Sequence, residues 1–169
     1  RIINVADKQN PVETGKYANP EMNGKPRAYN NIVLDGSVAY ITVDYCGMET
    51  LDISNPSDIR LLSWWNPWNC QTNPLNWFSS NGHSNEIALD KINKLVFMST
   101  GKSDMQVVSV ANPANPVHKY EYGGVDNNIG TWGVSVFNDN IYLSYICNPL
   151  PWPFPSNWTG IKMLKYQVK

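Results

Sequence analysis

The sequence has few charged residues and no cluster of either sign. Lys and Arg total 13 against 14 Asp and Glu in 169 residues, so the net charge is −1. The basic residues are scattered, whereas a general nucleic-acid surface needs them clustered, because its affinity comes from neutralising many phosphates together. No run approaches the ~20 apolar residues of a membrane-spanning helix. We therefore expect neither a nucleic-acid partner nor a transmembrane segment.

Cysteines and catalytic motifs are also scarce. The three cysteines, Cys46, Cys70 and Cys147, lack the C-x-x-C spacing of a metal site. We expect them to be small buried hydrophobes. A disulfide between two of them is the alternative, and the sequence does not choose the pair. No G-x-S-x-G elbow, phosphate-binding glycine loop or H-E-x-x-H pattern is present. The sequence therefore predicts no cofactor and no metal site.

What the sequence does contain is a repeated phrase with an Asn-Pro corner. It reads "IINVADKQNPVETGKY" (2–17), "METLDISNPSDIRLLSW" (48–64) and "MQVVSVANPANPVHKY" (105–120), and "IKMLKYQVK" (161–169) begins it again. Ile53, Val110 and Tyr166 mark the phrase at intervals of 57 and 56 residues. These intervals exceed the ~40–50 residues of a four-stranded propeller blade, and we attribute the excess to loop insertions.

Each repeat contains four short β-like runs and no sustained helical spacing. Apolar residues alternate with polar ones, and Asp-Gly or Asn-Asp pairs mark tight turns. Self-similar four-stranded units predict an all-β protein, a β-propeller of four-stranded antiparallel blades. A sandwich is the alternative, but it would not produce internal repeats. The expected blades lie near 1–17, 30–65, 84–122 and 131–169. They amount to about three blades, so we expect a piece of a larger propeller, and the start without Met suggests a mature or truncated product.

The repeat also resembles a known family. The units "GMETLDISNPSDIRLL" and "DMQVVSVANPANPVHKY", preceded by "VAYITVDY" and "KLVFMST", are similar to the LVIVD repeat of bacterial and archaeal surface proteins. The resemblance covers most of the chain in three or four copies, of which the last departs most. It implies a propeller fold and an extracytoplasmic location, and it implies no single activity.

The long connections are expected on one face of the propeller. In a meander, the connections after the second and fourth strands share a face, and these are the long ones: 15–30, 64–83, 123–131 and 147–160. Aromatic residues gather there, and loops on a rigid scaffold often bind partners. With Trp132 at the start of a first strand, the candidate binding residues are Trp64, Trp65, Trp68, Trp77, Phe78, Trp132, Trp152 and Trp158. The alternative is that these rings pack on each other and hold the loops.

A second group of residues is expected at the mouth of the central channel. It consists of Asn31, His83, Asn85 and Glu86, which start the first strands. His83 and Glu86 could serve a metal or an acid–base reaction, so a propeller hydrolase or lyase is the alternative function. No charged residue occurs between 64 and 82, which favours binding over catalysis.

The sequence thus predicts a non-catalytic, extracytoplasmic binding or scaffolding propeller. We expect its Trp-rich face to contact a glycan or a protein partner on the bacterial cell surface. An outer-membrane lipoprotein complex is a plausible setting, with the remainder of the propeller or other envelope subunits as partners.

Overall fold

The structure is a computed structural model, and it describes residues 1–72, 77–125, 127–150 and 154–167. Within these residues the chain forms antiparallel sheets and one short 3-10 helix, η1 (Pro20–Met22). The first sheet pairs β1 (Ile2–Asn4) with β2 (Val12–Gly15). Blade 1 consists of β3 (Tyr29–Asp35), β4 (Val38–Val43), β5 (Met48–Asp52) and β6 (Arg60–Trp65). Blade 2 consists of β7 (Ile87–Asp90), β8 (Leu95–Ser99), β9 (Met105–Ser109) and β10 (Val117–Tyr122). Blade 3 consists of β11 (Gly130–Phe137), β12 (Asn140–Asn148) and β13 (Ser156–Lys165).

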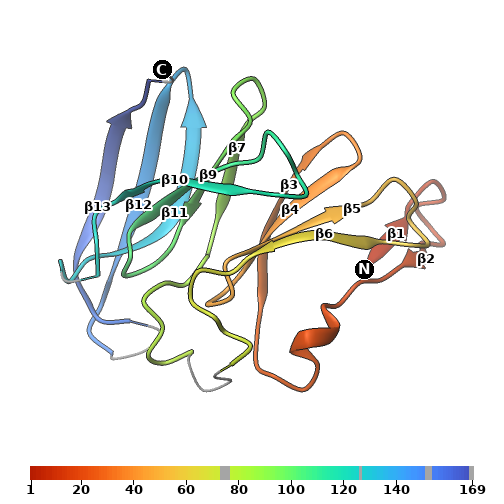
Figure 1. Ribbon diagram of the computed structural model, residues 1–169, viewed down its shortest axis with the longest axis horizontal. Helices are drawn as coiled ribbons and strands as arrows, with labels where there is room; N and C mark the ends of the chain where they lie inside the picture. The colour runs from red at the N-terminus through yellow and green to blue at the C-terminus, as the bar shows by residue number, and fades with distance from the viewer. Residues whose placement is uncertain (73–76, 126, 151–153, 168–169) are drawn as a thin grey trace.

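Every blade is a meander, because its strands pair in chain order. The first strand of blade 2, β7, contacts β3 of blade 1 and β11 of blade 3. Figure 1 shows the three blades side by side in an open arc, with β1 and β2 at one end and β13 at the other. The prediction of an all-β protein built from four-stranded antiparallel blades is confirmed.

The Asn-Pro corner is a recurring turn with a side-chain hydrogen bond. Asn55 Oδ1 accepts from Ser57 N at 3.1 Å, and Asn112 Oδ1 accepts from Ala114 N at the same distance. Asp7 takes this place in the first repeat, where its Oδ1 accepts from the backbone N of the residue two positions on at 3.0 Å. Asn and Asp favour such turns because their short side chains satisfy the backbone locally. The repeated Asn-Pro phrase therefore encodes the turn that connects the third strand of a unit to the fourth.

The hydrophobic core lies between neighbouring blades. Period-two alternation gives each strand two apolar faces, so each blade packs against a blade on either side. Tyr40 and Met48 of blade 1 pack against a group on blade 2 that includes Ile87, Val96 and Val108. The interface between blades 2 and 3 is a second cluster, formed by Phe97, Met105, Val107, Val134, Ile141, Leu143 and Tyr145.

The described parts of the long connections project from one side of the arc. Those that follow β2, β6 and β12 lie along the lower edge of Figure 1, opposite the tight turns between β3 and β4 and between β11 and β12. Asn138 and Asp139 in the latter turn have φ of 49° and 59°, as a two-residue hairpin of type I′ requires. Among the described residues, no helix has the length and hydrophobicity needed to cross a membrane.

Candidate functional site

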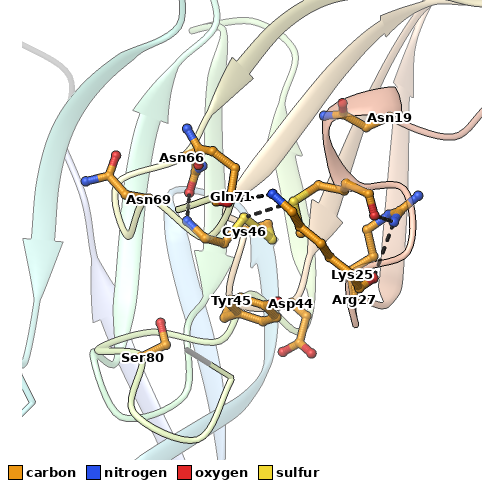
Figure 2. Close-up of a disulfide and its surroundings, with 12 residues drawn as sticks. Asn19, Lys25, Arg27, Asp44, Tyr45, Cys46, Asn66, Asn69, Gln71 and Ser80 are labelled. Atoms are coloured by element: carbon orange, nitrogen blue, oxygen red, sulfur yellow. Dashed lines mark hydrogen bonds between the residues drawn. A yellow bond between two sulfur atoms is a disulfide. The ribbon is translucent and has the colours of Figure 1, made fainter. Parts of the chain in front are cut away.

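A disulfide anchors the connection between β6 and β7. Cys46, in the turn between β4 and β5, is bonded to Cys70, and their Cα atoms are 5.2 Å apart. Figure 2 shows the bond beside Gln71, whose carbonyl oxygen accepts from Lys25 Nζ at 2.6 Å. Three connections therefore meet at the disulfide: those between β2 and β3, between β4 and β5, and between β6 and β7. The expectation of three buried hydrophobic cysteines is wrong, because Cys147 is exposed and the alternative, a disulfide between two of them, is what forms.

Two of the predicted binding residues, Trp64 and Trp77, are half-buried and hydrogen-bonded to the β4–β5 turn that carries Cys46. Trp64 Nε1 donates to the Cys46 carbonyl oxygen at 2.8 Å, and Trp77 Nε1 donates to Asp44 Oδ2 at 2.5 Å. Both rings pack against the small cluster of Met22, Val43, Tyr45, Cys46 and Cys70. These rings therefore hold the loops in place, which was the alternative weighed from the sequence.

His83 meets the Trp77 ring edge-on, with centroids 5.6 Å apart, and is only 1% exposed. Its Nδ1 is 2.9 Å from Asp44 Oδ1, and because a carboxylate can only accept, Nδ1 carries the proton. Among the described residues, Nε2 has no hydrogen-bond partner. Glu86 points elsewhere, and its Oε2 accepts from Val134 N of blade 3 at 3.3 Å. The structure gives His83 and Glu86 separate partners, and no metal-binding group of His, Cys, Asp and Glu is found in the described chain.

The other channel-mouth residues join one blade to the next through a buried hydroxyl. Thr42 Oγ1 accepts from Asn31 N at 3.0 Å and donates to the carbonyl oxygen of Asn85 at 3.0 Å. Ser99 Oγ repeats the arrangement one blade later, accepting from Glu86 N at 3.0 Å and donating to the Trp132 carbonyl oxygen at 2.8 Å. We call these hydroxyls latches. Asn31, Asn85 and Glu86 therefore contribute to the joints between blades.

An open aromatic groove lies between the outer strands of blades 1 and 2. The Trp65 ring stacks on His118 of β10, with centroids 5.9 Å apart and planes at 15°, and meets Trp68 edge-on at 6.1 Å. One cavity of about 230 Å³ is lined by Trp65, Pro67, Trp68, Gln106, His118 and Glu121. A second, of about 440 Å³, is lined by Ser63, Trp64, Trp65, Asn66, Pro67, Ala114, Asn115 and Pro116. Because Trp65 and Pro67 line both, the cavities adjoin.

The remaining predicted aromatic residues lie apart from this groove. Phe78 and Trp132 are exposed. Trp158 on β13 packs edge-on against Tyr145, with Lys162 Nζ 5.7 Å from the Trp158 ring centre. Trp152 lies outside the described residues. The structure thus brings Trp65 and Trp68 together in the smaller cavity and Trp64 and Trp65 together in the larger one, and Phe78, Trp132 and Trp158 line neither.

Gln106, His118 and Glu121 are groove residues that the sequence reasoning did not find. His118 lies on the exposed outer strand β10, and its Nε2 donates to Gln106 Oε1 at 2.8 Å. The sequence gives little indication of these residues, because β9 and β10 have the pattern of ordinary strands. The groove forms only where these strands meet blade 1.

Buried carboxylates elsewhere on this side are structural. Glu49 Oε1 accepts from Asn19 Nδ2 at 2.8 Å, and its Oε2 accepts from Tyr29 OH at 3.1 Å, so it holds the connection after β2. Burial raises the pKa of Glu49, while these hydrogen bonds oppose the shift. Asp104 likewise accepts from Tyr145 OH at 2.6 Å, and burial raises its pKa.

Comparison with known families identifies the unit from which blade 1 is built. Residues 26–66, which include all of β3 to β6, match the family model of the LVIVD repeat. The chain carries an LVIVD repeat. This confirms the family predicted from the sequence, and LVIVD repeats occur in β-propeller-like repeat proteins. No curated protein and no solved structure matches the chain significantly.

Proposed function

We propose that this LVIVD-repeat chain is a non-catalytic binding protein whose groove between blades 1 and 2 holds a glycan. The observation that carries the proposal is the pair of adjoining cavities that share Trp65. An indole offers a flat apolar surface to the C–H face of a sugar ring. Two adjoining cavities that share one indole suit successive residues of an oligosaccharide.

The polar side chains of the smaller cavity support a sugar ligand. Gln106, His118 and Glu121 supply amide, imidazole and carboxylate groups that can hydrogen-bond to hydroxyls. Ligand pockets commonly combine apolar walls with a few such groups, which fix the orientation of the ligand. Glu121 is the one charged side chain among the residues that line either cavity. We therefore propose that neutral and amino sugars bind more tightly than uronic acids.

The position of His83 supports binding over catalysis. Its ring is buried against Asp44 and Trp77, and it does not line either cavity. A general base must come within about 3 Å of the proton that it removes, so a ring enclosed in this way does not reach a ligand in the groove. The titratable side chains that line the groove are Glu121 and His118, and the His118 ring is stacked on Trp65 and hydrogen-bonded through Nε2 to Gln106 Oε1.

We also propose that the protein acts outside the cytoplasm, on the cell surface or within an envelope complex. The disulfide between Cys46 and Cys70 supports this, because such bonds persist in oxidising compartments and are rare in the cytosol. The sequence resemblance to surface proteins points the same way. An outer-membrane lipoprotein setting is part of the proposal.

The test is titration calorimetry of the purified chain with a panel of neutral, amino and uronic-acid oligosaccharides. We expect binding of at least one neutral or amino oligosaccharide and a loss of about tenfold or more in Trp68→Ala, since a buried aromatic anchor contributes over ~1.4 kcal/mol. Phe78→Ala is the matched control, because Phe78 is an exposed aromatic residue outside both cavities. Equal losses in the two variants, or no binding by any sugar, would refute the glycan proposal.

A further inference from the structure

Each blade carries a hydroxyl at the same position, but within the described residues the hydroxyl of blade 3 is not covered by another blade. Thr42, Ser99 and Ser144 are each the fifth residue of a second strand, counted from Val38, Leu95 and Asn140. Each pairs across the sheet with the same place on the third strand: Thr42 with Met48, Ser99 with Met105 and Ser144 with Ile161. Thr42 and Ser99 are 0% exposed because the next blade covers them, whereas Ser144 is exposed.

The residues around Ser144 repeat the rest of an inter-blade face. The third residue of the second strand is an aromatic one in every blade: Tyr40, Phe97 and Tyr142. Tyr40 and Phe97 are buried against the next blade, and Tyr142 is half-buried. On the third strand, Met48 and Met105 are buried, whereas Ile161 and Met163 are 73% and 65% exposed. Large apolar side chains gathered on one face mark an interaction surface.

We propose that this face of blade 3 receives a further four-stranded blade of the same repeat, and that Ser144 is the latch residue of that joint. The surface continues the two interfaces already formed, between blades 1 and 2 and between blades 2 and 3. The occupant therefore needs apolar residues at alternate positions of its first two strands, as Ile87, Leu89, Val96 and Met98 provide on blade 2. It also needs a backbone carbonyl at the start of its first strand, equivalent to that of Asn85, to accept from Ser144 Oγ.

A second copy of this chain fits the face less well than such a blade does. The matching apolar face of a second copy is the side of blade 1 that carries Ile32, Leu34 and Ile41. That side is partly occupied by β1 and β2 of the same copy. A Cβ on Gly15 of β2 would lie 1.7 Å from the Pro56 carbonyl oxygen, so the two segments are in direct contact. Blade 3 of another copy would have to displace β1 and β2.

The experiment supplies the blade covalently, which gives it a high effective concentration at the face. Ile53, Val110 and Tyr166 occupy equivalent places, because their backbone N atoms donate to Ser37, Lys94 and Asp139 carbonyl oxygens at 2.8, 2.8 and 3.1 Å. The extended chain therefore repeats residues 111–166 directly after Tyr166. The repeated segment supplies a fourth strand for blade 3, followed by three strands of a further blade, and it begins at the same point of the repeat as it does after Val110. In case this extension misfolds, a second one repeats residues 54–110 instead, with its Cys70 changed to Ser.

Ser144→Ala is then compared in the original and extended chains by thermal unfolding. We expect no change in the original chain and a midpoint lowered by about 2–4 °C in the extended chain, the loss expected for one buried hydrogen bond in a chain of this size. Ser99→Ala, at a latch that is already closed, should lower the midpoint in both chains. Ser57→Ala is the control, because Ser57 is an exposed serine in the turn between β5 and β6, away from blade 3, and should change neither.

Three results would overturn the inference. The first is an extended chain that folds but shows no effect of Ser144→Ala. The second is misfolding of both extensions. The third is dimerisation of the original chain, seen by light scattering and abolished by Met163→Glu, which would assign the face to a second copy. None of these outcomes depends on the glycan groove.

Discussion

The imidazole of His83 is joined to the carboxylate of Asp44, with Nδ1 2.9 Å from Oδ1, although the two residues lie 39 positions apart. Asp44 also accepts from Trp77 Nε1, so one carboxylate ties two rings of the β6–β7 connection to the turn after β4. Asp44 has φ of 32°, a left-handed conformation that Asp tolerates better than most residues. Residue 44 must therefore both accept two hydrogen bonds through its side chain and adopt a left-handed backbone conformation.

Replacing Asp44 should therefore destabilise the fold. Asp44→Ala leaves the buried His83 and half-buried Trp77 donors unpaired and places Ala at positive φ, and we expect a loss of about 3 kcal/mol in the free energy of unfolding. Asp44→Asn keeps the tolerance for positive φ and one acceptor oxygen, so its loss should be clearly smaller. Urea denaturation measures both. Equal losses, or a loss below about 0.5 kcal/mol for Ala, would show that the hydrogen bonds contribute little.

Removing the disulfide should cost a similar amount. Cys46 and Cys70 are separated by 24 positions, and a closed loop of this length stabilises the native state by roughly 3 kcal/mol in the chain-entropy model. The double variant Cys46→Ala, Cys70→Ala should lose about this much in urea denaturation under oxidising conditions. Cys147→Ala should be unchanged, because Cys147 is exposed and unbonded. A double variant as stable as the control would contradict the prediction.

Glu49 should make stability depend on pH. Burial raises its pKa above the ordinary 4.5, so the folded chain holds this proton more tightly than the unfolded chain. The stability contributed by the neutral form is present below pH 4.5 and is lost as pH rises through the raised pKa. The free energy of unfolding of the native chain, relative to Glu49→Gln, should therefore fall as pH rises above 4.5 and through the raised pKa. A difference that stays constant across urea denaturations in that range, or one that rises, would contradict this assignment.

Sequence reasoning was successful where the signal is local. The period-two runs gave the strands, and the Asn-Pro phrase predicted the corners, because Asn55 and Asn112 form their turns with neighbouring residues. The match of residues 26–66 to the LVIVD repeat follows from the same short-range pattern. Connection lengths also indicated which side of the arc carries the long loops, since strand order in a meander determines this.

Contacts between repeats could not be predicted in this way. Cys46 pairs with Cys70 because the β4–β5 turn and the β6–β7 connection meet in space, and no spacing rule encodes that meeting. In the sequence, Asp44 has only the pattern of a strand end, although its carboxylate holds the rings of His83 and Trp77. The tryptophans were grouped by loop, whereas the structure gives them different contacts. The indole N–H groups of Trp64 and Trp77 donate to the β4–β5 turn, and the Trp65 ring stacks on His118 across a blade boundary.

The position of the Trp68 ring can be tested without changing the ring itself. An added Cβ on buried Gly82 would lie 1.9 Å from Trp68 Cζ2, so Gly82→Ala must push the indole aside. We expect glycan affinity to fall about tenfold and the free energy of unfolding to fall by about 1–3 kcal/mol, as overpacking usually costs. Calorimetric titration and urea denaturation measure the two effects.

Gly36→Ala separates the displacement of Trp68 from a general loss of stability. Gly36 has φ of 60° in the β3–β4 turn, and an added Cβ there meets nothing within 4 Å, so this variant should lose about 1 kcal/mol through backbone strain alone. Its glycan affinity should equal that of the native chain, because the turn lies on the side opposite the long connections. If Gly82→Ala also binds normally, the exact placement of Trp68 does not matter to the ligand. The groove would then have to depend on Trp65 and His118 alone.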